Sequence, residues 1–172
     1  NDNAEPQMYL SLYLLNTGFL VLSGFVMTLI TETKSFIASE SEKISLIIIA
    51  LFTIAISQFV IVPYDVSSYF FLLVFFFFLI KYLEKSTPLY LLILGVLMVI
   101  STLNRESSAL SLSLMATVLY TKFGLKKETI VPIAVLGFTF IAVYLGMRVM
   151  SENFSTNDGN LFMENFSQPK NF

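Results

Sequence analysis

The sequence contains no cysteine and no histidine, and only 13% of its 172 residues are charged. The absence of cysteine excludes disulfides and thiolate metal sites. The absence of histidine removes the side chain that most often serves as a general base, a proton relay or a metal ligand. A soluble domain carries about one quarter charged residues, so the low charged fraction, with 56% hydrophobic residues and a mean hydropathy of +0.78, indicates a membrane protein. We therefore expect the lipid bilayer as its main partner, and no nucleic acid.

Six apolar runs are long enough, or nearly so, to cross a bilayer core of about 30 Å, which requires roughly 20 helical residues. They cover residues 8–31, 44–62, 66–83, 88–102, 105–123 and 130–150. The sequence thus predicts an all-α, polytopic transmembrane helical bundle of about six spans over residues 1–150. A polar extracytoplasmic loop or tail follows over 151–172. A start without methionine and this polar end predict an internal fragment of a longer protein.

The fourth and fifth runs allow two interpretations. Their strictly apolar parts are about 15 residues each, or roughly 22 Å of helix. They form either two full spans that include the polar turn between them, or a re-entrant hairpin whose tip stops inside the membrane. The second arrangement would bury Arg105 more deeply, where an ionised side chain is costly and more often functional.

The lysine and arginine residues are distributed unevenly between alternate loops. Seven follow the first, third and fifth spans, namely Lys34, Lys43, Lys81, Lys85, Lys122, Lys126 and Lys127. The other three are Arg105, Arg148 and Lys170. By the positive-inside rule the lysine loops face the cytoplasm, and the turns that contain Asp65 and Arg105 face the outer side. We therefore expect a multi-pass protein of the cytoplasmic (inner) membrane.

Asp65 stands directly before the third span and follows Pro63 and Tyr64. Aspartate is a preferred N-cap, so Asp65 is expected to cap the helix that starts at Val66. In the alternative interpretation its carboxylate faces a lumen on the outer side, which makes Asp65 a catalytic candidate.

Arg105 and Glu106 are the most unusual charged pair, because they lie between two apolar runs. Adjacent helical residues point about 100° apart, so the two side chains do not pair with each other within a helix. Arg105 either extends to lipid headgroups, with Glu106 in the first helical turn, or faces a cavity, where its planar fork can bind a phosphate or carboxylate. We expect Asp65 to lie close to Arg105 as its partner, and we take Glu106 as a second catalytic candidate.

Polar residues continue behind this turn. Asn104, Ser108 and Ser111 have the spacing i, i+4, i+7 and would share one face of the fifth helix. Such a stripe either packs against a neighbouring helix through hydrogen bonds or lines a polar cleft. Asn104 is thus a candidate substrate contact. Arg148, at the end of the last span, is either an interfacial anchor or a second phosphate-binding cation.

Two motifs carry a resemblance to known proteins. Pro63-Tyr64-Asp65 precedes an aromatic span, and Leu103-Asn104-Arg105-Glu106-Ser107-Ser108 lies at the start of a following helix. The arrangement resembles bacterial polytopic membrane proteins related to GT-C-type glycosyltransferases and EpsG-like polysaccharide-synthesis proteins, over about residues 60–150. In these proteins an Asn-Arg-Glu-Ser/Thr element opens a membrane helix.

The resemblance implies assembly of cell-surface glycan by sugar transfer from a polyprenyl-phosphate-linked donor on the outer face of the membrane. It makes Arg105 a phosphate-binding residue and Asp65 or Glu106 the carboxylate base, and a divalent metal is implied by the resemblance alone. The chain departs from the family in one respect, because the acidic motif of the first outer loop is not identifiable in it. Whether this chain itself is an enzyme therefore stays open. Two other functions are a transporter or flippase subunit and a non-catalytic structural subunit.

Overall fold

The computed structural model describes residues 4–60, 66–105 and 108–154. All the regular secondary structure in these residues is helical, with no strand, which confirms the predicted all-α class for this part of the chain. The helices are α1 (Ala4–Thr31), α2 (Glu40–Val60), α3 (Val66–Glu84), α4 (Pro88–Asn104), α5 (Ala109–Phe123) and α6 (Lys127–Phe154).

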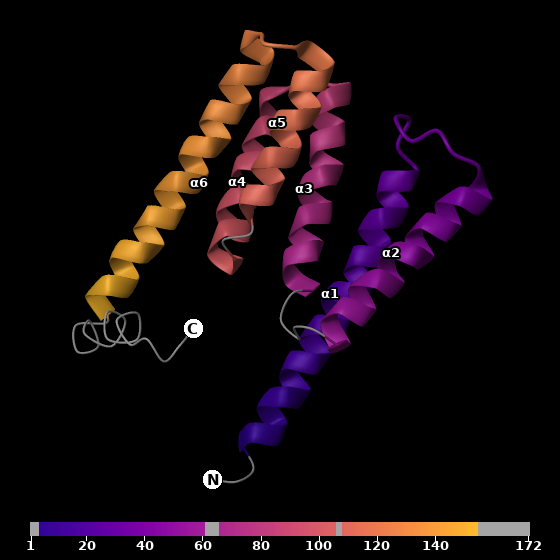
Figure 1. The fold of residues 1–172 in the computed structure, drawn as a ribbon, viewed down its shortest axis with the longest axis vertical. Helices are drawn as coiled ribbons and strands as arrows, with labels where there is room; N and C mark the ends of the chain where they lie inside the picture. The colour runs from indigo at the N-terminus through magenta and orange to yellow at the C-terminus, as the bar shows by residue number, and fades with distance from the viewer. Residues whose placement is uncertain (1–3, 61–65, 106–107, 155–172) are drawn as a thin grey trace, which may run out of the picture.

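The helices run up and down in alternation (Figure 1). Connections 32–39, 85–87 and 124–126 all lie toward the top of the figure, and we call this the lysine end. There the Ser35 hydroxyl donates to the Glu84 carboxylate at 3.2 Å, and the Lys122 ammonium donates to the Leu83 carbonyl. The opposite end holds the first turn of α3 and the α4–α5 turn, and we call it the Arg105 end.

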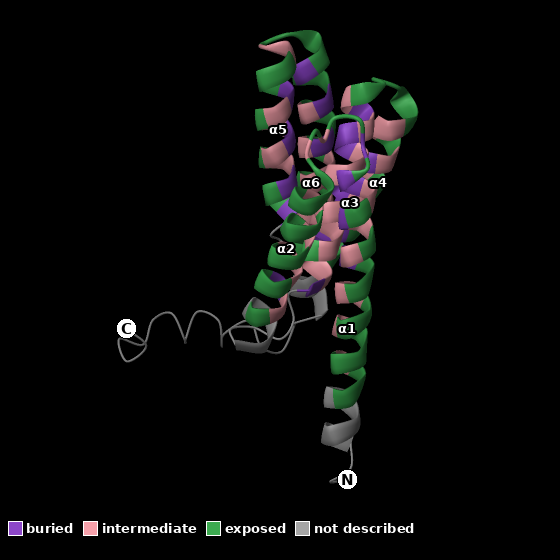
Figure 2. Cartoon of the chain, turned by 90° about the vertical axis from the view of Figure 1, so that its right-hand side faces the viewer, coloured by how far each residue is buried: buried purple, intermediate pink, exposed green. Residues whose placement is uncertain are grey.

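Helices α3, α4, α5 and α6 pack around one buried core, and α1 covers α3 on the side where α2 also lies. Figure 2 shows that buried residues concentrate in α3 to α6, whereas much of α1 and α2 is exposed. Each of the four core helices contributes fully or almost fully buried apolar side chains: Phe75, Leu79, Leu94, Met98, Met115, Leu119 and Leu136. This core fixes the positions of α3, α4 and α5, on which the cavity described below depends.

Three helices are long and apolar enough to cross a membrane, judged over the described residues. The spans are Leu10–Thr31, Val66–Glu84 and Lys127–Met150. In the last of these only 11% of the most apolar stretch is buried inside the protein, so most of its apolar surface points outward. Apolar side chains that face outward along a whole helix are typical of contact with lipid. Helices α4 and α5 are apolar but shorter.

The predicted polar turn lies between α4 and α5, but the helix that follows it starts later than the predicted span 105–123. Asn104 is the last residue of α4, and Arg105 has extended backbone angles (φ −164°, ψ 146°) that end the helix. Its amide still bonds to the Ser101 carbonyl at 2.9 Å. Helix α5 begins only at Ala109, after Ser108 donates its amide to the Arg105 carbonyl at 3.2 Å. The Asn-Arg motif therefore closes α4 and does not open α5.

Helix α2 begins with a capping box formed by Ser39 and Glu42. The Glu42 carboxylate accepts the Ser39 hydroxyl at 2.7 Å and the Ser39 amide at 2.8 Å, and these two hydrogen bonds lower the pKa of Glu42. A capping box of this kind pairs backbone donors that the first helical turn leaves unpaired.

Acidification is therefore expected to loosen the first turn of α2. The pKa of Glu42 is lower in the folded protein than its usual value of 4.5, so its stabilising contribution is complete above that pH and is lost as pH falls through the folded pKa. Hydrogen exchange of the amides in this turn, expressed as protection relative to the intrinsic exchange rate at each pH, measures the effect. Glu42→Gln keeps an acceptor but does not titrate, so it should remove the pH dependence of this protection. Protection that depends on pH equally in both proteins would contradict the assignment.

Candidate functional site

A cavity of about 240 Å³ lies at the Arg105 end, between α3 and the α4–α5 hairpin. The described residues that line it come from three places: Ser68, Tyr69 and Leu72 on α3, Ser101 and Arg105 at the end of α4, and Ser108, Leu110 and Ser111 at the start of α5. Drug-sized ligands occupy pockets of roughly 300–1,000 Å³. The volume of this cavity therefore suits a small group rather than a whole saccharide.

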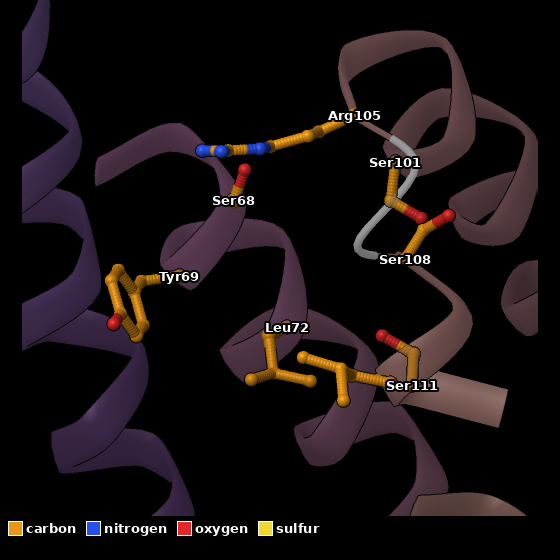
Figure 3. A pocket seen from close by; sticks show the side chains of 8 residues that line it. Ser68, Tyr69, Leu72, Ser101, Arg105, Ser108 and Ser111 are labelled. Carbon is orange, nitrogen blue, oxygen red and sulfur yellow. The ribbon is translucent and has the colours of Figure 1, made fainter. Parts of the chain in front are cut away.

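Arg105 stands at the mouth of the cavity. Because its backbone is extended, the side chain leaves the end of α4 sideways, and Figure 3 shows it reaching from the turn toward Ser68 on α3. The Arg105 side chain is exposed, so its guanidinium is accessible from outside the bundle. A guanidinium carries a permanent positive charge and five N–H donors in a planar fork.

Asn104 connects the ends of two helices directly beside this arginine. Its Oδ1 accepts the hydroxyl of Ser67 at 3.2 Å, and its Nδ2 donates to the hydroxyl of Ser68 at 3.3 Å. The Asn104 amide thus ties the last turn of α4 to the first turn of α3. This contact fixes the position of the residue that precedes Arg105, so Asn104 acts as a positioning residue for the cavity mouth.

The inner wall of the cavity is rich in hydroxyl groups. Ser101 and Thr102 both donate to the Met98 carbonyl, at 3.2 and 2.7 Å. The Thr102 hydroxyl also lies 3.0 Å from the Ser108 hydroxyl, and both residues are buried. This contact closes the hairpin from within and holds Ser108 at the cavity wall, where Figure 3 shows it facing Ser101.

The cavity combines a cation, several hydroxyl groups and apolar side chains. Arginine and serine hydroxyls are donors to phosphate or carboxylate oxygens. The walls contributed by Leu72, Leu110 and the ring of Tyr69 suit an apolar chain attached to such an anion. The arrangement therefore fits an amphipathic anion better than a free sugar.

Of the site residues expected from the sequence, two lie at the cavity, one lies elsewhere and two are outside the described residues. Arg105 lines the cavity, and Asn104 lies beside it. Asp65 and Glu106 lie outside the described residues, so their proximity to Arg105 stays a prediction. Arg148 is on the exposed part of α6 and is not among the described residues that line the cavity.

The predicted stripe of Asn104, Ser108 and Ser111 on one helix is wrong, because α4 ends at the first of these residues and α5 begins after the second. Ser108 and Ser111 nevertheless line the cavity with Ser101 and Ser68, which the sequence did not single out as site residues. The available signal was that Ser68 and Ser101 occupy helix ends that alternation of the spans brings to the same side.

The described residues contain no group of three or more acidic, histidine or cysteine side chains that could hold a metal ion. At the cavity they provide hydroxyls and a cation rather than the carboxylates that a divalent ion requires. The nearest acidic residues in the sequence, Asp65 and Glu106, lie outside the described part.

The sequence matches no protein-family model, and neither the curated proteins nor the solved structures provide a match to this chain. The resemblance to GT-C-type and EpsG-like proteins therefore stays a prediction from the two motifs.

Replacing Asn104 with alanine is expected to loosen the junction of α3 and α4. The variant loses two side-chain hydrogen bonds, each of which contributes about 0.5–1.5 kcal/mol and toward the lower value at an exposed site. We expect a loss of about 1 kcal/mol in the free energy of unfolding, measured by denaturant titration in detergent. Thr117→Ala is a matched control, because the exposed Thr117 hydroxyl donates to the Ser113 carbonyl of its own helix α5 at 2.9 Å. Equal losses in the two variants would show that the inter-helix contact has no special role.

Proposed function

We propose that the chain is part of a multi-pass membrane protein that assembles cell-surface glycan by glycosyl transfer from a polyprenyl-phosphate-linked donor. The supporting observation is the position of Arg105, whose exposed guanidinium stands over a hydroxyl-lined cavity at one end of an apolar helical bundle. A lipid-linked phosphate has the two properties that this site accommodates, an anionic group and an apolar chain.

The proposed topology has about six spans, with the lysine end in the cytoplasm and the Arg105 end outside. The positive-inside rule supports this orientation, because seven lysines lie at or near the lysine end. The contacts of Asn104 with Ser67 and Ser68 support full crossing by α4 and α5. They place the end of α4 level with the first turn of α3, and α3 is long enough to cross the membrane.

In this proposal the residues of the site divide the work of sugar transfer. Arg105 binds the donor phosphate and stabilises the negative charge that grows on it as the bond from sugar C1 to phosphate oxygen breaks. An acceptor hydroxyl forms the new bond to C1 and gives its proton to a carboxylate, for which Asp65 and Glu106 are the candidates. The serine hydroxyls donate hydrogen bonds to the phosphate, and Asn104 holds the end of α4 so that Arg105 stays beside it.

The test uses membranes that contain the full-length protein and a polyprenyl-phosphate donor with a radiolabelled sugar. Label should pass from the lipid to glycan, and membranes from cells that lack the protein should not support this transfer. Movement of intact lipid-linked sugar across the bilayer without transfer would identify a flippase and contradict the proposal. Neither transfer nor movement would leave a structural subunit as the function, and would equally contradict it.

A further inference from the structure

A group of lysines gathers at the lysine end, away from the cavity. We call Lys85, Lys122, Lys126 and Lys127 the lysine cluster; they belong to connections 85–87 and 124–126 and to the adjoining helix ends. The Lys122 ammonium donates to the Leu83 carbonyl, which holds the end of α5 against the end of α3. This contact brings the two connections side by side, as Figure 1 also shows for the ends of the helices that carry them.

The acidic residues of this end do not neutralise the cluster. Glu84 forms an ion pair with Lys81 at 3.4 Å, and Glu40 pairs with Lys43 at 2.7 Å. In the part of the chain that the structure describes, none of the four cluster lysines forms an ion pair with a carboxylate. Three of them, Lys85, Lys126 and Lys127, are exposed, and their side chains form no hydrogen bond with other described residues. The lysine end as a whole carries seven lysines against five glutamates (Glu32, Glu40, Glu42, Glu84 and Glu128), so an excess of two positive charges remains at this surface.

The position of two of these lysines opposes helix stability. Lys127 is the first residue of α6 and Lys126 precedes it, and the carbonyl of Lys126 accepts the amides of Thr129 and Ile130 at 3.0 Å. The amino end of a helix carries a partial positive charge that favours anions, and lysine adds to that potential instead of balancing it. Only Glu128 offsets it within the first turn. The local electrostatic potential is therefore positive and favours the binding of an anion from outside the protein.

An apolar side chain lies in the middle of the cluster. Gly124 ends α5 with φ 69°, a conformation that favours glycine, and the chain then turns so that Leu125 is 78% exposed. No other described side chain covers this leucine, which leaves its apolar surface in contact with the surroundings of the protein. Beside a membrane surface it reaches the boundary of the acyl chains while the lysines reach the headgroups.

We propose that the lysine cluster with Leu125 binds the headgroup of an anionic phospholipid in the leaflet at the lysine end. The phosphodiester contacts the lysines and the amino end of α6, and the glycerol and upper acyl region contact Leu125. This inference requires only that the bundle spans a membrane, and it does not depend on glycosyl transfer.

The test uses a fluorescent reporter on the full chain in neutral detergent micelles. Because the sequence has no cysteine, Thr87→Cys provides a single thiol for an environment-sensitive dye in the exposed connection beside Lys85, and it leaves the cluster lysines and Leu125 in place. Titration with phosphatidylglycerol should shift the emission to shorter wavelength, and titration with phosphatidylcholine should not. Inorganic phosphate should not compete at matched concentration; equal competition would identify a site for soluble phosphate and overturn the proposal.

Charge removal provides the second measurement. Lys126→Gln with Lys127→Gln should raise the half-saturating phosphatidylglycerol concentration about 30-fold, since each lysine at an anionic membrane surface contributes about 1 kcal/mol. The matched control is Lys43→Gln with Lys81→Gln, which removes the same charge from two lysines held in ion pairs. A control effect as large as that of the cluster variant would overturn the proposal. No response of the dye to phosphatidylglycerol would overturn it as well, and an acidic protein would then be the alternative partner of this surface.

Discussion

Replacing Arg105 with alanine in the full-length protein is expected to lower cell-surface glycan by about 10- to 100-fold. Hydrogen bonds to a charged group contribute about 1.5–3 kcal/mol, and each 1.36 kcal/mol in the barrier changes the rate tenfold. Arg105 is an exposed cation over the cavity and is not part of the buried core. Protein level and membrane insertion are therefore expected to stay normal, and surface glycan per inserted protein is the quantity to measure.

Arg105→Lys separates a specific contact from a general requirement for positive charge. Lysine keeps the charge but loses the planar fork, so it cannot bind a phosphate in the two-point manner of arginine. We expect Arg105→Lys to restore only a small part of the activity. Lys81→Ala removes one cation from the opposite end of the bundle and should leave glycan unchanged, which controls for charge loss as such.

Unchanged glycan in both Arg105 variants would give the residue a different role. The extended backbone at position 105 already ends α4, and this is enough to explain a helix terminus with an interfacial anchor. In that case the glycosyl-transfer proposal would lose its main support, while the interpretation of the chain as a helical membrane protein would stand, because it rests on the apolar helices.

The helices could be predicted from the sequence because lipid leaves little choice of backbone structure. Backbone groups in a bilayer must bond within the segment, so a long apolar run indicates a helix with little dependence on its neighbours. The predicted bounds of the third run, 66–83, differ from α3 by one residue. Pro88 likewise marks the start of α4 in both, as expected for proline at the first helical position.

A polar turn between α4 and α5 was predicted, but the residue at which α4 ends could not be, because it depends on contacts distant in the sequence. No proline or glycine lies between residues 96 and 123 to mark a break. Asn104 ends its helix beside α3, where it bonds to Ser67 and Ser68, 37 and 36 residues earlier in the chain. Helical periodicity alone therefore assigned Asn104 to the wrong helix.

The cavity depends both on the order of the helices, which the sequence predicts, and on contacts between distant residues, which it does not. The alternation of spans was sufficient to bring Arg105 and the start of the third span to the same end, so the region of the site followed from sequence. The residues of the inner cavity wall could not be predicted from the sequence. Ser101 and Ser108 face each other only because the Thr102 hydroxyl contacts the Ser108 hydroxyl and closes the hairpin. A serine near a helix end indicates a site residue only when the neighbouring helix end is known.

The largest expected effect on stability is that of Leu136→Ala in α6. Leu136 is fully buried and belongs to the core formed with α3, α4 and α5, and α6 is held mainly by its contacts with α4 and α5. Truncation of a buried leucine costs about 2–5 kcal/mol in soluble proteins. In lipid the transfer of apolar surface contributes little, and the remaining cost is the loss of van der Waals contacts around a void. We therefore expect a loss of about 2 kcal/mol in the free energy of unfolding.

Leu145→Ala provides the matched control, because Leu145 lies on the same helix and is 52% exposed. Both variants remove the same atoms from α6, but only Leu136→Ala opens a void between helices. Unfolding measured by denaturant titration in detergent should show a loss for Leu145→Ala of less than about 0.5 kcal/mol, as for surface substitutions in general. If the two variants lost equal stability, α6 would not be packed through Leu136, and the four-helix core that positions the cavity would need to be revised.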